Sequence, residues 1–234
     1  MALAIFIGVQ LGQRGRVPQP SCSDYSDLTE QVRKLIGAGE IGYAQRLVDG
    51  VLNNQTQPIC PSAKVALAGL RYNAAITEAL TLQRSTVGAV DSGHQATLKF
   101  LEAERFADQY GVPVEQRVAP MTVFTQSYNA GTWELARASF LTAWQRGSVN
   151  QLNLQAVDSY YATLFNMGTE LTNGDGEARA KGLVLVRTAE QIAKAYALPR
   201  LEARERLIRD LGSDETTWPA PSPDDPVLVA SSKK

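Results

Sequence analysis

The chain contains 234 residues and carries a formal net charge of −1, from 23 Lys and Arg against 24 Asp and Glu. This balance argues against the strongly basic surface with which proteins bind nucleic acids or anionic membranes. One His and two Cys leave few ligands for soft metal ions and few nucleophiles, so we expect no metal, no cofactor and no nucleic-acid partner.

The N-terminal segment, residues 1–27, differs from the rest of the chain. Residues 2–9 form an uncharged apolar run, much shorter than the roughly 20 residues needed to span a bilayer. The run is similar to the central part of a secretory signal, but no basic residue precedes it. Two interpretations stay open: a signal remnant, or a short arm that packs on the body or on a partner. Residues 13–27 are typical of a linker, and we expect membrane association only through this N-terminal segment.

The body of the chain is predicted to be entirely helical. Apolar residues recur at spacings of three and four, and residues 62–112 and 121–198 contain no proline. Alternation of β-branched residues, which would favour strands, is almost absent. The pattern predicts helices near 27–37, 41–54, 62–82, 92–110, 115–130, 133–146, 152–170, 176–196 and 200–211.

The C-terminal residues 212–234 contain four prolines and show no helical period. This composition predicts an extended or disordered tail. Trp218 and the apolar residues 227–229 lie inside the tail and are candidates for docking on a partner. The amphipathic helix predicted at 200–211 is expected to cap the helical domain before the tail begins.

Two short similarities within the chain indicate internal repetition. Residues 103–113 and 189–199 share Ala, Glu, Ala, Tyr and Pro at a single offset of 86 residues. A second pattern, aromatic-Asn-x-small, begins at Tyr72, Tyr128 and Phe165. Each instance falls in the first helix of a predicted helix pair, so both patterns agree with a chain built from pairs.

This layout resembles the tetratricopeptide-repeat family, most clearly in residues 128–143. The matching positions are Gly131 at the turn between helices, then Trp133, Ala136, Phe140 and Ala143. Residues 39–51 repeat the register more faintly, and the spacing of the units departs from the regular 34 residues of the family. The resemblance implies an all-α, TPR-like α-solenoid of antiparallel helix pairs over residues 28–211, with a C-terminal capping helix and extended termini.

The resemblance also implies a binding groove. In peptide-binding members of the family, an Asn near the end of each first helix bonds the backbone of the ligand. The corresponding residues here are Tyr72, Asn73, Tyr128, Asn129, Phe165 and Asn166. They are expected to hold a protein or peptide partner on the concave surface. The alternative is that the three Asn residues cap or brace the turns between helices.

The two cysteines, Cys22 and Cys60, lie in proline-flanked segments outside the long helices. Together with the signal-like start they suggest one disulfide, which by loop-entropy arithmetic would stabilise the fold by about 3–4 kcal/mol. This pairing favours an extracytoplasmic, cell-envelope location, either periplasmic or secreted. Two reduced thiols in a cytoplasmic protein are the alternative.

No residue pattern supplies a catalytic site. His94 lies near a predicted helix start without a partner in the sequence, and the Glu pairs at 102/104 and 202/205 have Arg neighbours typical of a solvated helix face. Residues 172–177 look like a fragment of a calcium loop but lack its spaced carboxylates, which favours a turn.

These features predict a non-enzymatic protein–protein interaction module, a scaffold or assembly subunit of a larger complex of the cell envelope. Two alternatives stay open. One is an all-α enzyme that acts on a polymer in its groove, and the other is a structural oligomer subunit that uses its termini as interlocking arms.

Overall fold

The computed structural model describes residues 25–54, 59–83, 89–199, 205, 208–209 and 218–231. Throughout these ranges the regular elements are helices, and no strand occurs in them, so the all-α prediction is confirmed. The helices are α1 (Ser26–Gly37), α2 (Ile41–Leu52), α3 (Pro61–Leu82), α4 (Ala89–Gln109), α5 (Pro120–Asn129), α6 (Trp133–Gln145), α7 (Leu154–Thr172), α8 (Gly176–Ala195) and α10 (Pro226–Ser231). A 3₁₀ turn, η2 (Val114–Gln116), precedes α5.

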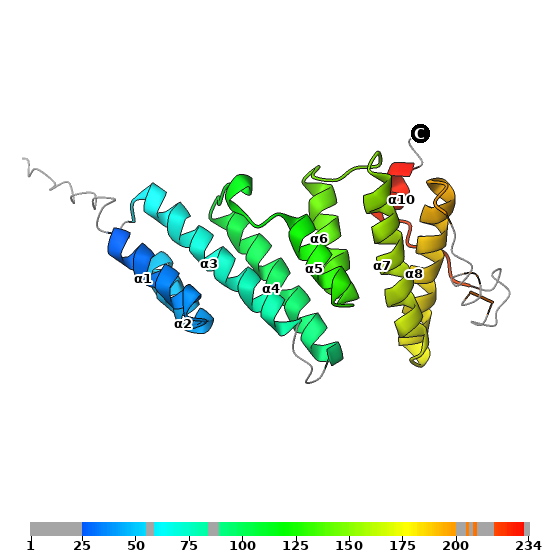
Figure 1. Cartoon of the computed structure of the whole chain (residues 1–234), viewed down its shortest axis with the longest axis horizontal. Coiled ribbons are helices and arrows are strands. Elements are labelled where there is room, and N and C mark those ends of the chain that lie inside the picture. The colour runs from blue at the N-terminus through cyan, green and yellow to red at the C-terminus, as the bar shows by residue number, and fades with distance from the viewer. Residues whose placement is uncertain are drawn as a thin grey trace, which may run out of the picture.

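The helices pack in chain order as neighbouring pairs. The pairs α1/α2, α3/α4, α5/α6 and α7/α8 each share an extensive interface, and successive pairs meet through α2–α3, α4–α6 and α6–α7. Figure 1 shows the pairs following one another along the long axis of the molecule, from α1 at one end to α8 at the other. Within the described ranges, no helix is both long and apolar enough to cross a membrane.

Most predicted helix boundaries agree with the structure to within three residues. The exception is the helix predicted at 115–130, which begins only at Pro120. Proline fits the first turn of a helix but not its interior, and so the chain before Pro120 forms η2 and an extended link instead. The predicted N-terminal segment falls outside the described residues up to position 24. Of the predicted capping helix at 200–211, only residues 205 and 208–209 are described, and these are helical.

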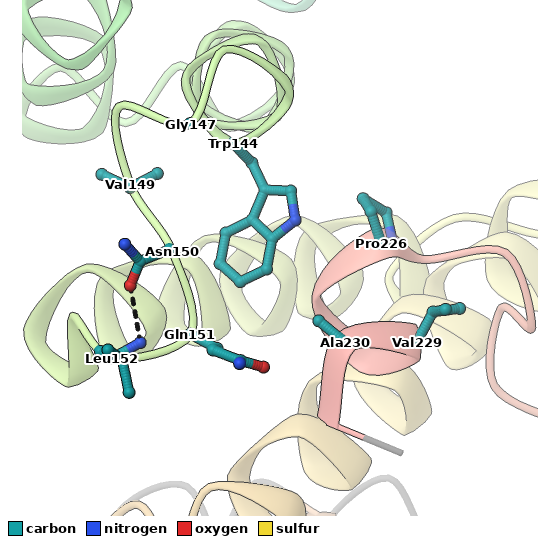
Figure 2. A pocket seen from close by; sticks show the side chains of 9 residues that line it. All are labelled: Trp144, Gly147, Val149, Asn150, Gln151, Leu152, Pro226, Val229 and Ala230. Atoms are coloured by element: carbon teal, nitrogen blue, oxygen red, sulfur yellow. Dashed lines mark hydrogen bonds between the residues drawn. The ribbon is translucent and has the colours of Figure 1, made fainter. Parts of the chain in front are cut away.

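The C-terminal segment differs from the prediction of an extended or disordered tail. Residues 226–231 form α10, which packs against α8, and the side chains of Trp218 and Val227 are buried in the main core. Figure 2 shows α10 facing the end of α6 across Trp144. Trp218 and Val227 therefore dock on their own domain, and their burial offsets the disorder that the prolines favour.

The same pair of backbone hydrogen bonds closes more than one helix, and the α5–α6 turn is an example. There the amide of Gly131 donates to the carbonyl of Tyr128, and the amide of Thr132 donates to the carbonyl of Ser127. Gly131 has a φ of 70°, a left-handed conformation that residues with a Cβ adopt only at a cost. The same pair of bonds ends α8, but there an alanine, Ala197, takes the left-handed position with a φ of 52°.

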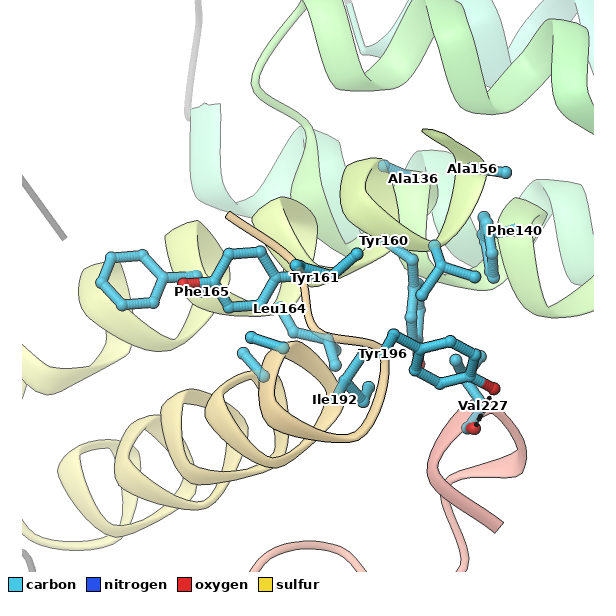
Figure 3. Close-up of a cluster of buried hydrophobic side chains, with 14 of the residues drawn as sticks. Ala136, Phe140, Ala156, Tyr160, Tyr161, Leu164, Phe165, Ile192, Tyr196 and Val227 are labelled. Carbon is cyan, nitrogen blue, oxygen red and sulfur yellow. Dashed lines mark hydrogen bonds between the residues drawn. The ribbon is translucent and has the colours of Figure 1, made fainter. Parts of the chain in front are cut away.

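The largest buried cluster joins α5, α6, α7, α8 and α10 (Figure 3). Its centre is a stack of Phe140 on Tyr160, with ring centroids 4.4 Å apart, and Phe124 packs edge-on against Phe140 at 5.5 Å. A second cluster lies between α3, α4, α5 and α6, and a third between α1, α2 and α3. Each cluster is shared by consecutive helix pairs, so no pair buries its apolar face alone.

A buried carboxylate connects the second cluster to its neighbours. Glu104 on α4 is 8% exposed. It accepts a hydrogen bond from the Tyr72 hydroxyl at 2.8 Å, and it forms ion pairs with Arg117 and Arg146. Burial raises the pKa of the Tyr72 phenol, while the charges of Arg146 and Arg117 act in the opposite sense. Tyr72 therefore stays protonated and is the donor in this contact.

A further ionic contact ties α2 to α3 and α4. The Arg71 side chain, 9% exposed, lies between Asp49 on α2 and Glu102 on α4, at 3.3 and 2.9 Å. Its guanidinium also lies over the ring of Phe106, 5.0 Å from the centroid. Because a buried guanidinium needs acceptors around it, Arg71 fixes the relative position of these three helices.

Helices α7 and α8 approach each other closely at Gly168 and Gly182. A Cβ built on Gly168 would lie 2.8 Å from the Gly182 carbonyl oxygen and 2.7 Å from a methyl of Val186. A Cβ on Gly182 would lie 2.6 Å from the Gly168 carbonyl oxygen. Since backbone atoms block both positions, only glycine lets the two helices lie this close.

We expect Gly168→Ala to lower the free energy of unfolding by about 2–4 kcal/mol, because α7 and α8 would have to separate. Urea unfolding followed by circular dichroism measures the change. Gly50→Ala is the matched control, since Gly50 is exposed in a helix with nothing within 4 Å of an added Cβ. It should stabilise the protein slightly, and equal effects of both variants would contradict the close packing of α7 on α8.

We expect Glu104→Gln to lower the free energy of unfolding by about 3 kcal/mol or more, because Arg117 and Arg146 would lose their shared counter-charge. Thermal and urea unfolding measure this loss. Glu115→Gln removes the same charge from an exposed position and should change stability by less than about 0.5 kcal/mol. A loss at Glu104 no greater than that control would show that the buried ion pairs contribute nothing.

Candidate functional site

The aromatic residues predicted for a concave groove do not gather on one surface. Tyr72 is fully buried in the cluster between α3 and α4, and Phe165 is 1% exposed in the large C-terminal cluster. Tyr128 is partly buried and packs edge-on against Trp133, with ring centroids 5.6 Å apart. The prediction is corrected for Tyr72 and Phe165: their helical positions face the interior, where large rings fill the space between helices, so neither ring is available to a partner.

The three predicted asparagines lie on the first helices of successive pairs. Asn73 on α3 and Asn166 on α7 are partly buried, and Asn129 ends α5 and is exposed. Unlike Asn153, whose side chain accepts from the Ala156 amide at the start of α7, none of the three has a side-chain hydrogen bond to another described residue. Whether they bind a partner stays a prediction.

The predicted disulfide falls partly outside the described residues, because Cys22 lies there. Cys60 is 6% exposed at the start of α3, and its Sγ lies 3.1 Å from the hydroxyl of Ser62. The pairing of Cys22 with Cys60 stays a prediction. In the described part of the chain, no three His, Cys, Asp or Glu side chains gather in a way that could hold a metal ion.

A pocket of about 400 Å³, which we call the acidic pocket because Glu134 and Glu170 line it, lies where α3, α5 and α7 end and α4 and α6 begin. Its lining residues include two carboxylates, an imidazole, an indole and a thioether. They are Gln83, Ser92, Gly93, His94, Ala130, Gly131, Thr132, Trp133, Glu134, Met167, Glu170 and Leu171.

Two contacts across helix pairs organise the acidic pocket. Nδ1 of His94 lies 2.9 Å from Oε1 of Glu134, and the indole N–H of Trp133 donates to Oε1 of Glu170 at 2.6 Å. The sequence indicates no partner for His94 because Glu134 is 40 residues away. The predicted helix boundaries nevertheless bring these residues together. In an antiparallel layout, the helices predicted to start at 92 and 133 and the helix predicted to end at 170 have those ends on the same side of the bundle.

A second pocket, which we call the apolar pocket, lies at the opposite ends of the helices. It has a volume of about 680 Å³ and is formed by the end of α6, the loop before α7 and α10. The lining residues are Trp144, Gly147, Val149, Asn150, Gln151, Leu152, Pro226, Val229 and Ala230. Figure 2 shows the Trp144 indole between the loop and α10. Asn150 shapes the loop by accepting the Leu152 amide at 2.9 Å.

The rim of the apolar pocket is unusually exposed. The side chain of Leu152 is 80% exposed and that of Val229 is 38% exposed. Leu154, the first residue of α7, follows Leu152 closely and is 50% exposed. Large apolar side chains that line a pocket and also face solvent are typical of a surface that a partner covers.

One side of the apolar pocket depends on Asp225, which is 2% exposed. It accepts the Tyr160 hydroxyl at 2.7 Å and the backbone amides of Val227 and Leu228 at 3.1 and 3.3 Å. The Tyr196 hydroxyl donates to the carbonyl of Val227 at 3.0 Å. Asp225 thus caps the start of α10 and ties it to α7, which positions Val229 beside the loop.

Comparison with known proteins finds no relative. No family model, no curated protein and no solved structure matches this chain.

We expect the free energy of unfolding to fall above about pH 10, and less steeply in Tyr160→Phe than in the wild type. Burial raises the pKa of the Tyr160 phenol well above its usual value, and the Asp225 carboxylate raises it further. The folded state therefore keeps a proton that the unfolded chain releases, so stability is complete below about pH 10 and is lost as pH rises.

Urea unfolding at pH 8 and pH 11 measures this effect. Some of the decline should persist in Tyr160→Phe, since burial also raises the pKa of Tyr72 and Tyr196. Tyr43→Phe, at a position 49% exposed, is the control and should follow the wild type. Equal slopes for Tyr160→Phe and Tyr43→Phe would contradict the buried contact between Tyr160 and Asp225.

Proposed function

We propose that this protein is a non-enzymatic interaction module that binds an apolar segment of another protein in the apolar pocket. The observation that carries the proposal is the 80% exposure of Leu152 on the rim of a pocket lined by Trp144, Pro226 and Val229. Covering one such leucine contributes about 1.5–3 kcal/mol to binding, which is enough for a small pocket to determine partner choice.

The architecture supports an α-solenoid similar to tetratricopeptide repeats. Each helix pair contacts mainly the next pair, as expected of a stack that grows in one direction. The small residues Ala136 and Ala143 and the aromatic Phe140 are fully buried between pairs, in agreement with their proposed repeat positions. Such a stack presents an extended surface to partners, which suits a scaffold or assembly subunit.

The two pockets at opposite ends of the helices suit a subunit that contacts a large partner at more than one point. The cell-envelope location is proposed on the apolar residues 2–9 and the cysteine pair. An enzyme acting on a polymer would instead require acid–base groups positioned in an enclosed cleft, whereas His94 and Glu134, with side chains 52% and 41% exposed, lie in an open one.

The apolar pocket can be tested with a displayed library of random peptides selected on the full chain. We expect enriched peptides to contain apolar residues and to bind Leu152→Asp at least about tenfold more weakly than the wild type. Leu101→Asp is the matched control, because Leu101 is 39% exposed on α4 and far along the chain from the pocket. Its affinity should equal that of the wild type.

Two results would overturn the proposal. Failure of the library to enrich any apolar peptide, or equal binding by Leu152→Asp and Leu101→Asp, would remove the pocket as the binding surface. Sedimentation equilibrium tests the structural-oligomer alternative: self-association of the wild type that is lost in Leu152→Asp would show that a second copy of this chain covers the pocket.

A further inference from the structure

The C-terminal segment, residues 218–231, lies on the rest of the domain as a peptide lies on its receptor. Two apolar side chains anchor it in the main core: Trp218 is 7% exposed and Val227 is fully buried. Between these anchors, every residue except Asp225 is exposed or only partly buried. A few deeply buried anchors along a chain that is otherwise near the surface are typical of a bound peptide.

Two backbone groups of the segment are bonded by side chains of α8 and its end. The Ser222 amide donates to Oγ1 of Thr188 on α8 at 2.8 Å, and the hydroxyl of Tyr196, directly after α8, donates to the carbonyl of Val227 at 3.0 Å. Figure 3 marks the second of these bonds with a dashed line. Hydrogen bonds to the main chain of a ligand are a general means of peptide recognition.

Asp225 adds a requirement for one particular side chain. Its carboxylate is buried, and one oxygen accepts the hydroxyl of Tyr160 on α7 while the other accepts the amides of Val227 and Leu228. The neighbouring Asp224 is exposed. Because both oxygens of Asp225 are used, a side-chain amide in its place, which has one oxygen, would lose one of these contacts.

The surface that receives the segment is held together by contacts that do not involve it. Helices α7 and α8 pack closely at Gly168 and Gly182, and the ring of Tyr160 stacks on Phe140 of α6. Residues 200–217 lie between α8 and the segment in the sequence, so the contacts of the segment with α7 and α8 join residues that are distant along the chain. Such a surface can release one copy of the segment and bind another.

We infer that α7 and α8 form a peptide-binding site whose ligand is the segment 218–231, and that the segment of a second copy of this chain binds there in place of the chain's own. The second copy supplies the same Trp218, Asp225 and Val227, so the exchange keeps the contacts described above. The chain's own segment competes, because its covalent connection gives it a high effective concentration. The inference does not depend on the proposed function, since the contacts that carry it do not involve Leu152.

The probe for the test is a synthetic peptide of residues 218–231 with fluorescein at its C-terminal end, and fluorescence anisotropy measures its binding to the full chain. The receiving chain carries Val227→Asp, which prevents its own segment from docking because a carboxylate would enter the apolar core. We expect a Kd of about 100 µM or below. The wild-type chain should bind the peptide at least about tenfold more weakly, because its own segment competes.

Two variants of the peptide form a matched pair. Asp225→Asn should weaken binding at least about tenfold, because the contact with Tyr160 or the contacts with the two amides are lost. Asp224→Asn makes the same change at the neighbouring exposed position and should bind within about twofold of the unchanged peptide. Circular dichroism shows whether the Val227→Asp chain is folded. If it is not, the same comparison of peptides on the wild-type chain decides the result.

Two complementary variants of the full chain test whether a second copy supplies the segment. Val227→Asp keeps the receiving surface intact, whereas Tyr160→Phe combined with Tyr196→Phe removes two donors of that surface and keeps the segment intact. At concentrations above the Kd of the peptide, sedimentation velocity should show a one-to-one dimer in the mixture. Each variant alone should be predominantly monomeric.

Three results would overturn the inference. They are the absence of saturable binding of the peptide to either receiving chain up to about 1 mM, equal binding of the two peptide variants, and a mixture that contains only monomers although the peptide binds. The last result would assign the site to a segment of a different protein. Leu152-dependent binding of apolar peptides is measured separately, so failure of the segment exchange would leave the proposed function intact.

Discussion

One buried carboxylate, that of Glu104, holds the middle of the molecule together. It is reached from four elements: its own helix α4, Tyr72 on α3, Arg117 in the link before α5 and Arg146 directly after α6. A charge removed from water is tolerated only when donors and opposite charges surround it. The relative placement of the second and third helix pairs is therefore set by polar geometry as well as by the fit of apolar side chains.

This placement determines where the two pockets lie. Because the pairs are antiparallel and in register, the ends of α3, α5 and α7 come together at one end of the bundle with the starts of α4 and α6, around the acidic pocket. The opposite end receives the end of α6 and the start of α7, and α10 completes the apolar pocket there. The acidic pocket is lined from the second and third pairs, so a rotation of one relative to the other would alter it, and the ion pairs of Glu104 act on this surface as well as on stability.

Much of the fold could be predicted from the sequence, because helix periodicity and prolines are local signals. The long helices and the turn at Gly131 depend on residues within a few positions of one another. The contacts that define the sites join residues far apart: Glu104 with Arg146, His94 with Glu134 and Tyr160 with Asp225. No local pattern reports such a pairing.

The difference between local patterns and contacts of distant residues also explains the two main errors of the sequence-based prediction. The repeat pattern assigns Tyr72 and Phe165 to a groove because they precede asparagines, but which face of a helix is buried depends on the neighbouring pair. The composition of segment 212–234 predicts disorder because its prolines dominate. Its docking depends on Asp225 meeting Tyr160 from 65 residues away, and on the burial of Val227 in a cluster to which several distant helices contribute.

The position of α10 has a consequence for biosynthesis. Most contacts of this protein join neighbouring helices, so the first pairs have their partners soon after they leave the ribosome. The apolar pocket is different, because Pro226, Val229 and Ala230 complete its wall and belong to a helix that follows α1 to α8 in the chain. A nascent chain that has exposed only α1 to α8 lacks this wall of the pocket. If a partner binds this pocket as proposed, it meets the complete surface only on chains whose α10 has left the ribosome and packed on α8.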